Sequence, residues 1–320
     1  MQDKKPKLIA VAGPTASGKS SLALSLAEKL CTEIICCDSM QIYRLMDIGT
    51  AKPTKEERAC VPHRLFDVVD PDVDFSCADY VRLAKEEIAD VCASGRVPVV
   101  CGGTGLYLDA LLRGSDFENT SIDTELRRSL EELAKSEGNE ALHKELMLID
   151  PESAEAIHPN NVKRVIRAIE IYRTSGITKS EIDRRSRECE SEYDALVMAL
   201  RYNKRELLYE RIDKRVDAMI SEGLVEETER LFGEGIFDKN TTASQAIGYK
   251  EMLGYIKGEM SLDDATDLLK CATRRYAKRQ MTWFSSKSYV AWIDADVNGK
   301  MRSFDDIFAE AYELVKAHLG

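Results

Sequence analysis

The feature that most constrains this chain of 320 residues lies near its start, where an apolar run at 8–12 passes directly into GPTASGKS at 13–20. The spacing Gly-x-x-x-x-Gly-Lys-Ser is that of a phosphate-binding loop, and the flanking residues predict the strand before it and the helix after it that such a loop requires. Successive N–H groups and the positive end of the following helix would face an anion. The pattern predicts a phosphate site but does not identify the phosphorylated compound.

The predicted loop also indicates a metal ion. Lys19 supplies a mobile cation, and the Ser20 hydroxyl is of the type that ligates Mg²⁺ beside a bound phosphate. We therefore expect Mg²⁺ as the cofactor, with Ser20 as its protein ligand. All residues of the loop are expected to surround the phosphate: Gly13, Pro14, Thr15, Ala16, Ser17, Gly18, Lys19 and Ser20.

Short apolar runs alternate with stretches of helical periodicity, which is the pattern of an α/β fold with a parallel sheet. The runs, each as long as a buried strand, are 8–12, 34–37, 65–69, 97–101, 195–200 and 290–293. We predict a P-loop NTPase-like parallel sheet flanked by helices, with the C-terminal helices at 204–232, 261–287 and 304–319.

Strand-like runs disappear between about 114 and 192, where charged amphipathic helices are expected at 124–136, 139–149 and 160–174. This interruption predicts an inserted all-helical domain at 116–192. The core domain would then be discontinuous, formed by 1–115 and 193–320.

Composition excludes some classes of protein and partner. The sequence has no apolar run long enough to cross a bilayer and no signal peptide, so we expect a cytoplasmic protein without a membrane partner. Its nine cysteines include no Cys-x-x-Cys pair, which predicts reduced thiols that pack as small hydrophobic residues. Nothing suggests an obligate dimer, and we expect a monomer. The net charge of −11 argues weakly against nucleic acid.

Polar residues follow the second and fourth apolar runs, and ligands of parallel sheets gather beyond the carboxyl ends of the strands. Asp38 could accept a proton from a nucleophile or hold it by a hydrogen bond, although it could instead be a second-sphere Mg²⁺ ligand or a helix N-cap. Gln41 offers a donor and an acceptor, which suits a purine edge but also suits a solvated loop. Thr104 lies in a Gly-Gly-Thr-Gly turn that permits close backbone approach, or that forms only a tight turn.

Two basic helical faces offset the overall acidity. Within 161–173 the basic residues lie opposite an apolar stripe, and within 273–284 they are interleaved with aromatic residues. The basic residues are Lys163, Arg164 and Arg167 in the first segment and Arg274, Arg275, Lys278 and Arg279 in the second. Such faces are often only solvated. Two of them in an acidic chain favour a surface that binds phosphodiesters.

Taken together and in this order, the motifs resemble those of the tRNA dimethylallyltransferases. The matching blocks are GPTASGKS (13–20), DSMQIY (38–43), GTAKP (49–53), GGTGLY (102–107), NVKRVIRAIEIY (161–172), SQAIGYKE (244–251) and YAKRQMTWF (276–284). They span nearly the whole chain. The phosphate loop alone is generic, but its combination with DSMQIY and KRQMTWF is specific.

The resemblance implies transfer of a dimethylallyl group from dimethylallyl diphosphate to N6 of the adenosine immediately 3′ of the anticodon of a tRNA. The products would be N6-(dimethylallyl)adenosine and diphosphate. The loop would hold the diphosphate, and the insertion would hold the anticodon stem-loop.

The implied catalytic residues are Asp38, Lys19 and Thr104, with Arg211 and Arg215 as further, unassigned candidates for the diphosphate. Together with the basic faces, the resemblance implies tRNA contacts from Asp38, Ser39, Met40, Gln41, Thr104, Arg127, Asn161, Val162, Lys163, Arg164, Val165, Arg167, Lys278, Arg279 and Gln280.

Three alternatives share parts of this pattern. A small-molecule kinase that uses ATP would explain the loop and Asp38 but would leave the insertion and the basic faces without a role. A dimethylallyltransferase acting on free adenine nucleotides should not need a long insertion. A tRNA-binding protein with a relic loop would not be expected to keep Lys19, Ser20 and Asp38.

Overall fold

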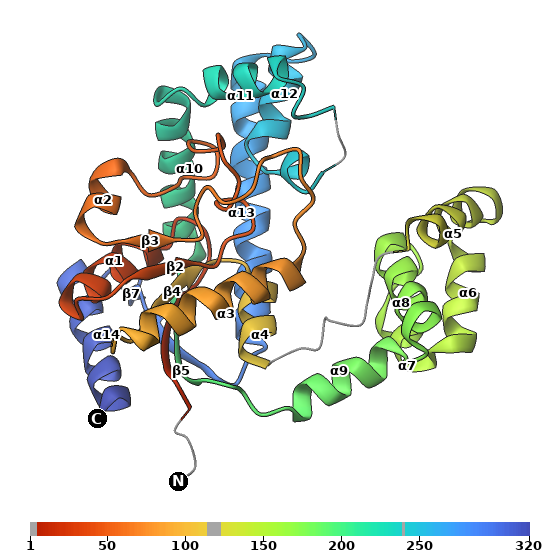
Figure 1. Ribbon diagram of the computed structural model, residues 1–320. Coiled ribbons are helices and arrows are strands. Elements are labelled where there is room, and N and C mark those ends of the chain that lie inside the picture. The colour runs from red at the N-terminus through yellow and green to blue at the C-terminus, as the bar shows by residue number, and fades with distance from the viewer. Residues whose placement is uncertain (1–4, 114–122, 239–240) are drawn as a thin grey trace. The chain divides into compact units, whose positions relative to one another are not determined.

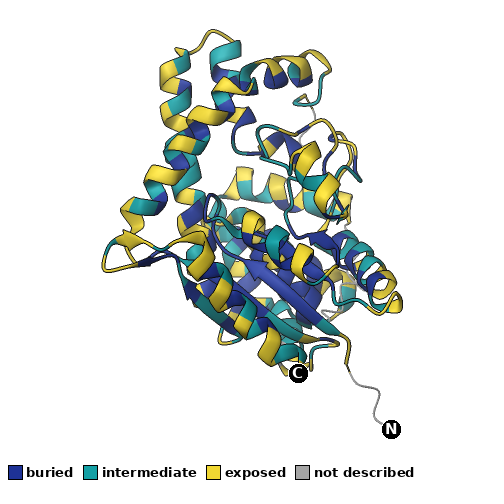
Figure 2. Cartoon of the chain, turned by 90° about the vertical axis from the view of Figure 1, so that its left-hand side faces the viewer, coloured by how far each residue is buried: buried dark blue, intermediate teal, exposed yellow. Residues whose placement is uncertain are grey.

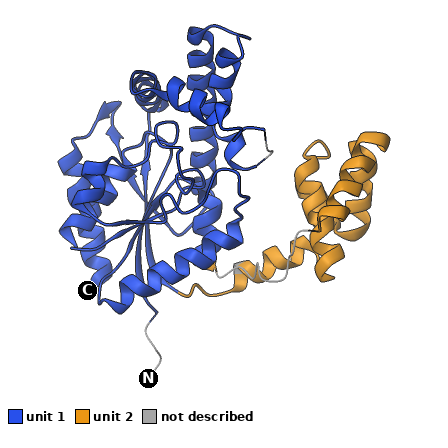
Figure 3. Ribbon diagram, turned by 45° about the horizontal axis from the view of Figure 1, so that its top comes forward, with its two compact units in different colours: residues 1–112, 193–320 blue, residues 113–192 orange. Residues whose placement is uncertain are grey.

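The computed structural model describes residues 5–113, 123–238 and 241–320, apart from the side chain of Arg187. Its contacts divide the chain into two compact units, one formed by 1–112 and 193–320 and the other by 113–192 (Figure 3). The second predicted boundary, between 192 and 193, coincides with this division. The first predicted boundary, between 115 and 116, lies outside the described residues.

The first unit holds the strands of the fold and the helices around them (Figure 1). In chain order its elements are β1 (Lys7–Ala12), α1 (Lys19–Lys29), β2 (Ile34–Cys36), α2 (Lys55–Cys60), β3 (His63–Arg64), α3 (Cys77–Ala93), β4 (Val99–Gly102), α4 (Gly105–Arg113), β5 (Asp194–Arg201), α10 (Arg205–Ser221), α11 (Leu224–Gly233), the 3-10 helix η1 (Ala243–Gln245), α12 (Tyr249–Ile256), α13 (Leu262–Ser285), β6 (Val290–Asp294), β7 (Asp296–Val297), β8 (Lys300–Met301) and α14 (Phe304–Leu319).

The main sheet has the strand order β3-β2-β4-β1-β5-β6, and its neighbouring strands pair in parallel. Strand β1 lies between β4 and β5, and its residues 8–12 are buried because helices flank the sheet (Figure 2). Buried strands of a parallel sheet are continuously apolar, which explains why the short apolar runs could be recognised. The arrangement confirms the predicted α/β class.

The strand predicted at 65–69 is wrong. Strand β3 ends at Arg64, and the residues that follow bend instead of continuing, with positive φ angles of 62° at Leu65 and 58° at Asp67. Extended backbone requires negative φ, so this apolar run cannot be a strand. Only Val69 forms an isolated parallel bridge, to Tyr43.

The single helix predicted at 204–232 is also wrong, because the chain forms two helices there. Helix α10 ends at Ser221, and α11 begins after Gly223, whose φ of 105° lies in the left-handed region that glycine readily adopts. The break turns the chain, and it brings the first residues of α11 to the segment that follows β2.

A second hydrophobic cluster, separate from the one beneath the sheet, joins helices α10 to α13 to the segment 40–51. Its buried members are Ile42, Tyr43, Met46, Val69, Val216, Met219, Leu224, Leu231, Ala243, Ala246, Tyr249, Met252, Ala265 and Leu269. Much of the segment after β2 is therefore anchored in a core.

The other unit, described from 123 onward, is helical and contains no strand among its described residues. Its helices are α5 (Thr124–Glu137), α6 (Asn139–Ile149), α7 (Pro151–Ala156), α8 (Val162–Ser175) and α9 (Lys179–Glu188). The helices predicted at 124–136, 139–149 and 160–174 correspond to α5, α6 and α8. A core of leucine, isoleucine, valine and alanine residues from α5 to α8 holds the unit together.

All nine cysteines are free thiols, as predicted. They are not all core residues, however, because Cys31, Cys60 and Cys189 are exposed. Across the described residues, no helix combines the length and the apolar composition that a bilayer crossing would need.

Candidate active site

The loop predicted to bind phosphate connects β1 to α1. Gly13 has a φ of 136° and Gly18 one of 96°, and Gly18 is the residue that precedes the first turn of α1. A Cβ atom at Gly13 would also lie 3.4 Å from the backbone of Leu200. Both positions therefore require glycine, and the backbone N–H groups at the start of α1 remain available for an anion.

Gln280 of α13 braces this loop. Its side-chain oxygen accepts a hydrogen bond from the Thr15 N–H at 2.8 Å, and its nitrogen donates to the Gly103 carbonyl at 2.9 Å. The residue is only 5 % exposed. Gln280, predicted to contact tRNA, therefore links the phosphate loop to the glycine-rich turn after β4, while also lining the cavity described below.

Replacing Gly103 by alanine should loosen this link. A Cβ atom there would overlap Nε2 of Gln280, so the amide must move away from Thr15. We expect a loss of about 1–3 kcal/mol in the free energy of unfolding, as for other overpacked sites, together with weaker binding of inorganic diphosphate. Thermal unfolding and calorimetric titration would measure both. Gly233→Ala is the control, because nothing lies within 4 Å of its added Cβ; equal effects of the two variants would contradict the proposed brace.

Three cationic side chains converge on the loop. Lys19 Nζ lies 3.4 Å from the Pro14 carbonyl, and Arg211 of α10 donates from Nε to the Ala16 carbonyl at 2.9 Å. Desolvation lowers the pKa of Lys19, and it lowers the pKa of the neighbouring Arg215 as well. In the described part of the chain, neither Lys19 nor Arg215 forms an ion pair with a carboxylate. A bound anion would therefore relieve the cost of holding these charges away from water.

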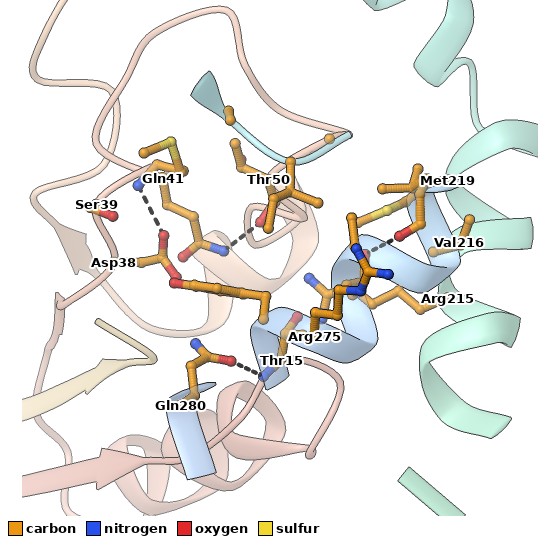
Figure 4. A pocket seen from close by; sticks show the side chains of 18 of the residues that line it. Thr15, Asp38, Ser39, Gln41, Thr50, Arg215, Val216, Met219, Arg275 and Gln280 are labelled. Carbon is orange, nitrogen blue, oxygen red and sulfur yellow. Dashed lines mark hydrogen bonds between the residues drawn. The ribbon is translucent and has the colours of Figure 1, made fainter. Parts of the chain in front are cut away.

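Two cavities meet at this point. The smaller, of about 360 Å³, is lined by Ala16, Gly18, Lys19, Ser20, Ser21, Arg211, Lys214 and Arg215. The larger, of about 410 Å³, shares Lys19, Ser20 and Arg215 with it (Figure 4). The larger cavity also reaches Asp38 and Gln41, so one continuous set of residues runs from the phosphate loop to the polar residues after β2.

Asp38 follows β2 and lines the larger cavity. One of its carboxylate oxygens accepts a hydrogen bond from the Met40 N–H at 2.9 Å (Figure 4). The residues after Asp38 form turns and not a helix, so the alternative that Asp38 is a helix N-cap is wrong. The bond to Met40 instead fixes a carboxylate at the cavity wall.

Thr104 supports the backbone next to Asp38. Its hydroxyl accepts a hydrogen bond from the Ser39 N–H at 3.0 Å, and its own N–H donates to the Cys37 carbonyl at 3.2 Å. Ser39 and Met40 line the larger cavity, whereas Thr104 is not among its lining residues. The contacts of Thr104 therefore act on Asp38 through the chain between them.

The basic residues of α13 have different surroundings. Arg275 and Arg279 line the larger cavity, and the Arg279 guanidinium lies 5.5 Å from the ring centroid of Tyr276. Arg274 instead pairs with Asp213 of α10, and Lys278 is exposed. The four residues, which were expected to share one face, thus divide between the cavity, a helix contact and solvent.

In the helical unit, Asn161, Lys163 and Arg164 are exposed, and Val162 is partly buried. Val165 is 0 % exposed and belongs to the core of the unit, so its side chain has a packing role there.

Two arginines of the same unit, Arg127 and Arg167, meet one buried carboxylate. Arg127 donates from Nε and Nη2 to Glu170 at 2.7 and 2.8 Å. Arg167 also pairs with Glu170, at 3.4 Å, and Glu170 itself is 0 % exposed. One buried carboxylate thus fixes the positions of both guanidinium groups, which remain partly exposed.

Several cavity residues were not predicted individually. Tyr276, Gln245 and Lys250 line the larger cavity without having been predicted there, and Arg275 was expected only as part of the basic face at 273–284. An apolar wall was also missed, formed by Val216, Met219, Ala246, Ile247, Leu269 and Ala272. The motifs SQAIGYKE and YAKRQMTWF were the available signal, since they contain or adjoin most of these residues.

Comparison with known proteins identifies the family that the sequence motifs resemble, over most of the chain. The sequence profile of the family described as IPP transferase matches residues 41–287, and that described as isopentenyl transferase matches residues 6–66. A curated tRNA dimethylallyltransferase of Acetivibrio thermocellus is 49 % identical over 289 residues, which cover 90 % of this chain and 92 % of the relative. One of Halalkalibacterium halodurans is 45 % identical over 316 residues, 98 % of each.

Solved structures agree with these matches. The full-length tRNA isopentenylpyrophosphate transferase of Bacillus halodurans superimposes with a TM-score of 0.72 at 42 % identity, over 99 % of this chain and 97 % of that one. A eukaryotic dimethylallyltransferase acting on tRNA gives a TM-score of 0.77 at 29 % identity, over 98 % of this chain and 80 % of that one. On the phosphate loop, the cavity beside it and these matches over most of its length, the chain belongs to the IPP transferase family.

Proposed function

We propose that this chain transfers the dimethylallyl group of dimethylallyl diphosphate to N6 of the adenosine immediately 3′ of the anticodon in tRNA. The allylic carbon–oxygen bond breaks, a carbon–nitrogen bond forms, diphosphate leaves, and one proton of the amine passes to a base. The observation that carries this proposal is the larger cavity, which joins the phosphate loop to the Asp38 carboxylate. A leaving group and a nucleophile can thus be held at two ends of one space.

The loop end suits the leaving group. Departing diphosphate gains negative charge as the carbon–oxygen bond breaks, and fixed donors and cations that meet this charge lower the barrier. The N–H groups at the start of α1 and the side chains of Lys19, Arg211 and Arg215 supply them. The partly desolvated setting of Lys19 and Arg215 strengthens the interactions that these two side chains make.

Mg²⁺ is the proposed cofactor, and the residues at this end fit it. The Ser20 side chain is exposed and borders both cavities, close to where the diphosphate would lie. Among the described residues, no cluster of three histidine, cysteine or acidic side chains suits a metal ion. Mg²⁺ would therefore be held by Ser20, the substrate phosphates and water, a common arrangement for this ion, and would neutralise phosphate charge.

The opposite end suits an adenine amine. This amine is a poor nucleophile because its lone pair is delocalised into the ring, so it needs a partner that orients it and takes its proton. Asp38 would fill that role, with Thr104 holding the adjacent backbone. The apolar wall that includes Val216, Met219 and Leu269 would receive the branched allyl group between the two ends.

An adenine in an anticodon loop must be turned out of the stack to enter such a cavity. Arg275, Arg279 and Tyr276 line the cavity, and a stacking ring with nearby guanidinium groups suits an extruded nucleotide. The helical unit would hold the anticodon stem-loop through its exposed basic residues. Since its substrate would be tRNA, we expect the enzyme to act in the cytoplasm. We also expect it to act as a monomer.

The direct test is a transfer assay with labelled dimethylallyl diphosphate, Mg²⁺ and unmodified tRNA, in which ATP and AMP serve as competing substrates. The proposal requires label in tRNA, with release of diphosphate. Phosphorylation of a small molecule by ATP, or label in AMP but not in tRNA, would contradict it.

The exposed cations of α8 give a prediction about tRNA affinity. If Lys163 and Arg164 contact phosphates, replacing both by alanine should reduce the slope of log affinity against log salt by roughly 0.7–0.9 per lost contact. Filter binding across a salt series would measure the slope. Lys135 and Lys144, exposed on α5 and α6, provide a matched double variant that should leave it unchanged. An unaltered slope in the α8 variant would mean that this face is merely solvated.

A further inference from the structure

One buried carboxylate outside the predicted site is bonded to a segment that lines the cavity. Glu227 lies in the first turn of α11 and is 7 % exposed, whereas its neighbour Glu226 is less buried. A buried carboxylate is costly unless its oxygens are hydrogen-bonded. The partners of Glu227 therefore indicate why the fold keeps it.

Those partners are consecutive backbone N–H groups of the segment after β2. Asp47 donates to Glu227 at 3.1 Å, Ile48 donates at 3.0 and 3.1 Å to its two oxygens, and Gly49 donates at 3.1 Å. The Tyr249 hydroxyl adds a fourth donor at 2.6 Å. Burial raises the pKa of Tyr249, so its phenol remains protonated and keeps donating. Four donors on one carboxylate fix the path of the segment.

The segment after β2 also packs closely against the ring of Tyr249. A Cβ atom at Gly49 would lie 2.5 Å from the ring of Tyr249, which is itself 0 % exposed. Just beyond it, the Lys52 side chain is 2 % exposed and pairs with Asp47 and Asp67. These contacts leave the backbone at 47–52 little freedom to shift.

The next two carbonyls of this segment hold Gln41. Its side-chain nitrogen donates to the Thr50 carbonyl at 2.9 Å (Figure 4). It also donates to the Ala51 carbonyl at 2.9 Å. Both amide hydrogens are thus used, and a reversed amide would place its oxygen against two carbonyl oxygens. The side-chain oxygen of Gln41 accepts a weak hydrogen bond from the Cys36 thiol at 3.9 Å, and its second lone pair leaves acceptor capacity for a ligand. Gln41, Gly49 and Thr50 all line the larger cavity.

We propose that Glu227 is a positioning residue that acts through Gln41. By fixing residues 47–49 it places the carbonyls of Thr50 and Ala51, and these hold the Gln41 amide with its oxygen available to an N–H donor of the bound base. An adenine amine offers such a donor, whereas a hypoxanthine carbonyl at the same ring position does not. This inference rests on the proposed function, in which the cavity receives the adenosine.

The test is Glu227→Gln in the full-length chain, with Glu226→Gln as the matched control on the same turn. The amide group introduced by this substitution would oppose some of the four donors, and we expect kcat/KM for tRNA to fall about 10- to 100-fold, with KM for dimethylallyl diphosphate unchanged. The ratio of the binding affinity for tRNA with adenosine at the target position to that for tRNA with inosine there should also fall. The control should behave like the wild-type chain.

A double-mutant cycle separates positioning from general destabilisation. In a Gln41→Ala background, Glu227→Gln should cost less than about twofold further, because its effect passes through a side chain already removed. Gly49→Ala displaces the same segment without touching Glu227 and should reproduce the loss, which keeps the test valid if Glu227→Gln fails to fold. The inference would be overturned if the losses in kcat/KM of Gln41→Ala and Glu227→Gln were additive. It would also be overturned if Glu227→Gln impaired the use of tRNA and of dimethylallyl diphosphate equally. An inactive wild-type chain would instead count against the proposed function.

Discussion

Replacing Asp38 by asparagine or alanine is expected to lower turnover by about 100-fold or more while tRNA affinity changes little. Asparagine can still accept the hydrogen bond from Met40, so the local turn should survive. What it cannot do is take a proton from the adenine amine as the new carbon–nitrogen bond forms. The loss should therefore appear in kcat and not in substrate binding.

Single-turnover kinetics with saturating tRNA, together with a direct binding measurement, would separate these terms. Asp70→Asn is a suitable control, because this carboxylate is exposed and pairs with Arg44 at the surface. If Asp38→Asn turned over near the wild-type rate, Asp38 would have no role in the chemical step. If tRNA affinity fell by as large a factor as kcat/KM, Asp38 would act in binding alone.

Replacing Lys19 by methionine is expected to lower kcat/KM by about 100- to 1000-fold, since the variant loses a cation aimed at the leaving diphosphate. The same residue should shape the pH dependence. Desolvation lowers the Lys19 pKa below its ordinary value of 10.5. In the free enzyme the ammonium is present below this lowered pKa and is lost as the pH rises through it, so kcat/KM should fall at a pH below 10.5.

A pH–rate series of the wild-type chain and two variants checks this assignment. Lys19→Met should lose the alkaline limb together with most of the activity, and Lys19→Arg should move the limb to higher pH because a guanidinium keeps its proton. Lys29→Met, at the other end of α1, is the control. An alkaline limb that persists unchanged in Lys19→Met would show that another group titrates.

Features that depend on neighbours in the sequence were predicted well. The phosphate loop is defined by its own glycines and by the strand and helix beside it, and the buried residues of strands β1, β4 and β5 form unbroken runs without a charged residue. The run at 65–69 shows the limit of that signal, because positive φ angles at Leu65 and Asp67 have no counterpart in apolar composition. Similarly, Gly223 inside a helical pattern did not reveal whether the helix would break there.

The site was predictable where the topology of a parallel sheet is sufficient. Asp38 and the loop share the cavity because both follow strands at the same edge. The contacts that fix Gln41 were not predictable, because Glu227 reaches Gly49 across 178 positions of sequence. Nor does helical periodicity distinguish Arg275, in the cavity, from Arg274, which pairs with Asp213. That distinction depends on where α10 lies.

The central claim is that one cavity holds the leaving diphosphate on the loop and the adenine amine at Asp38. A crystal structure of the chain with tRNA and an unreactive analogue of dimethylallyl diphosphate tests it most directly. The account predicts diphosphate at the N–H groups of the loop, with N6 of the extruded adenine at about 2.6–3.2 Å from the Asp38 carboxylate. An adenine bound away from Asp38, or a loop that binds only the phosphates of ATP with the γ-phosphate directed at an acceptor, would contradict it.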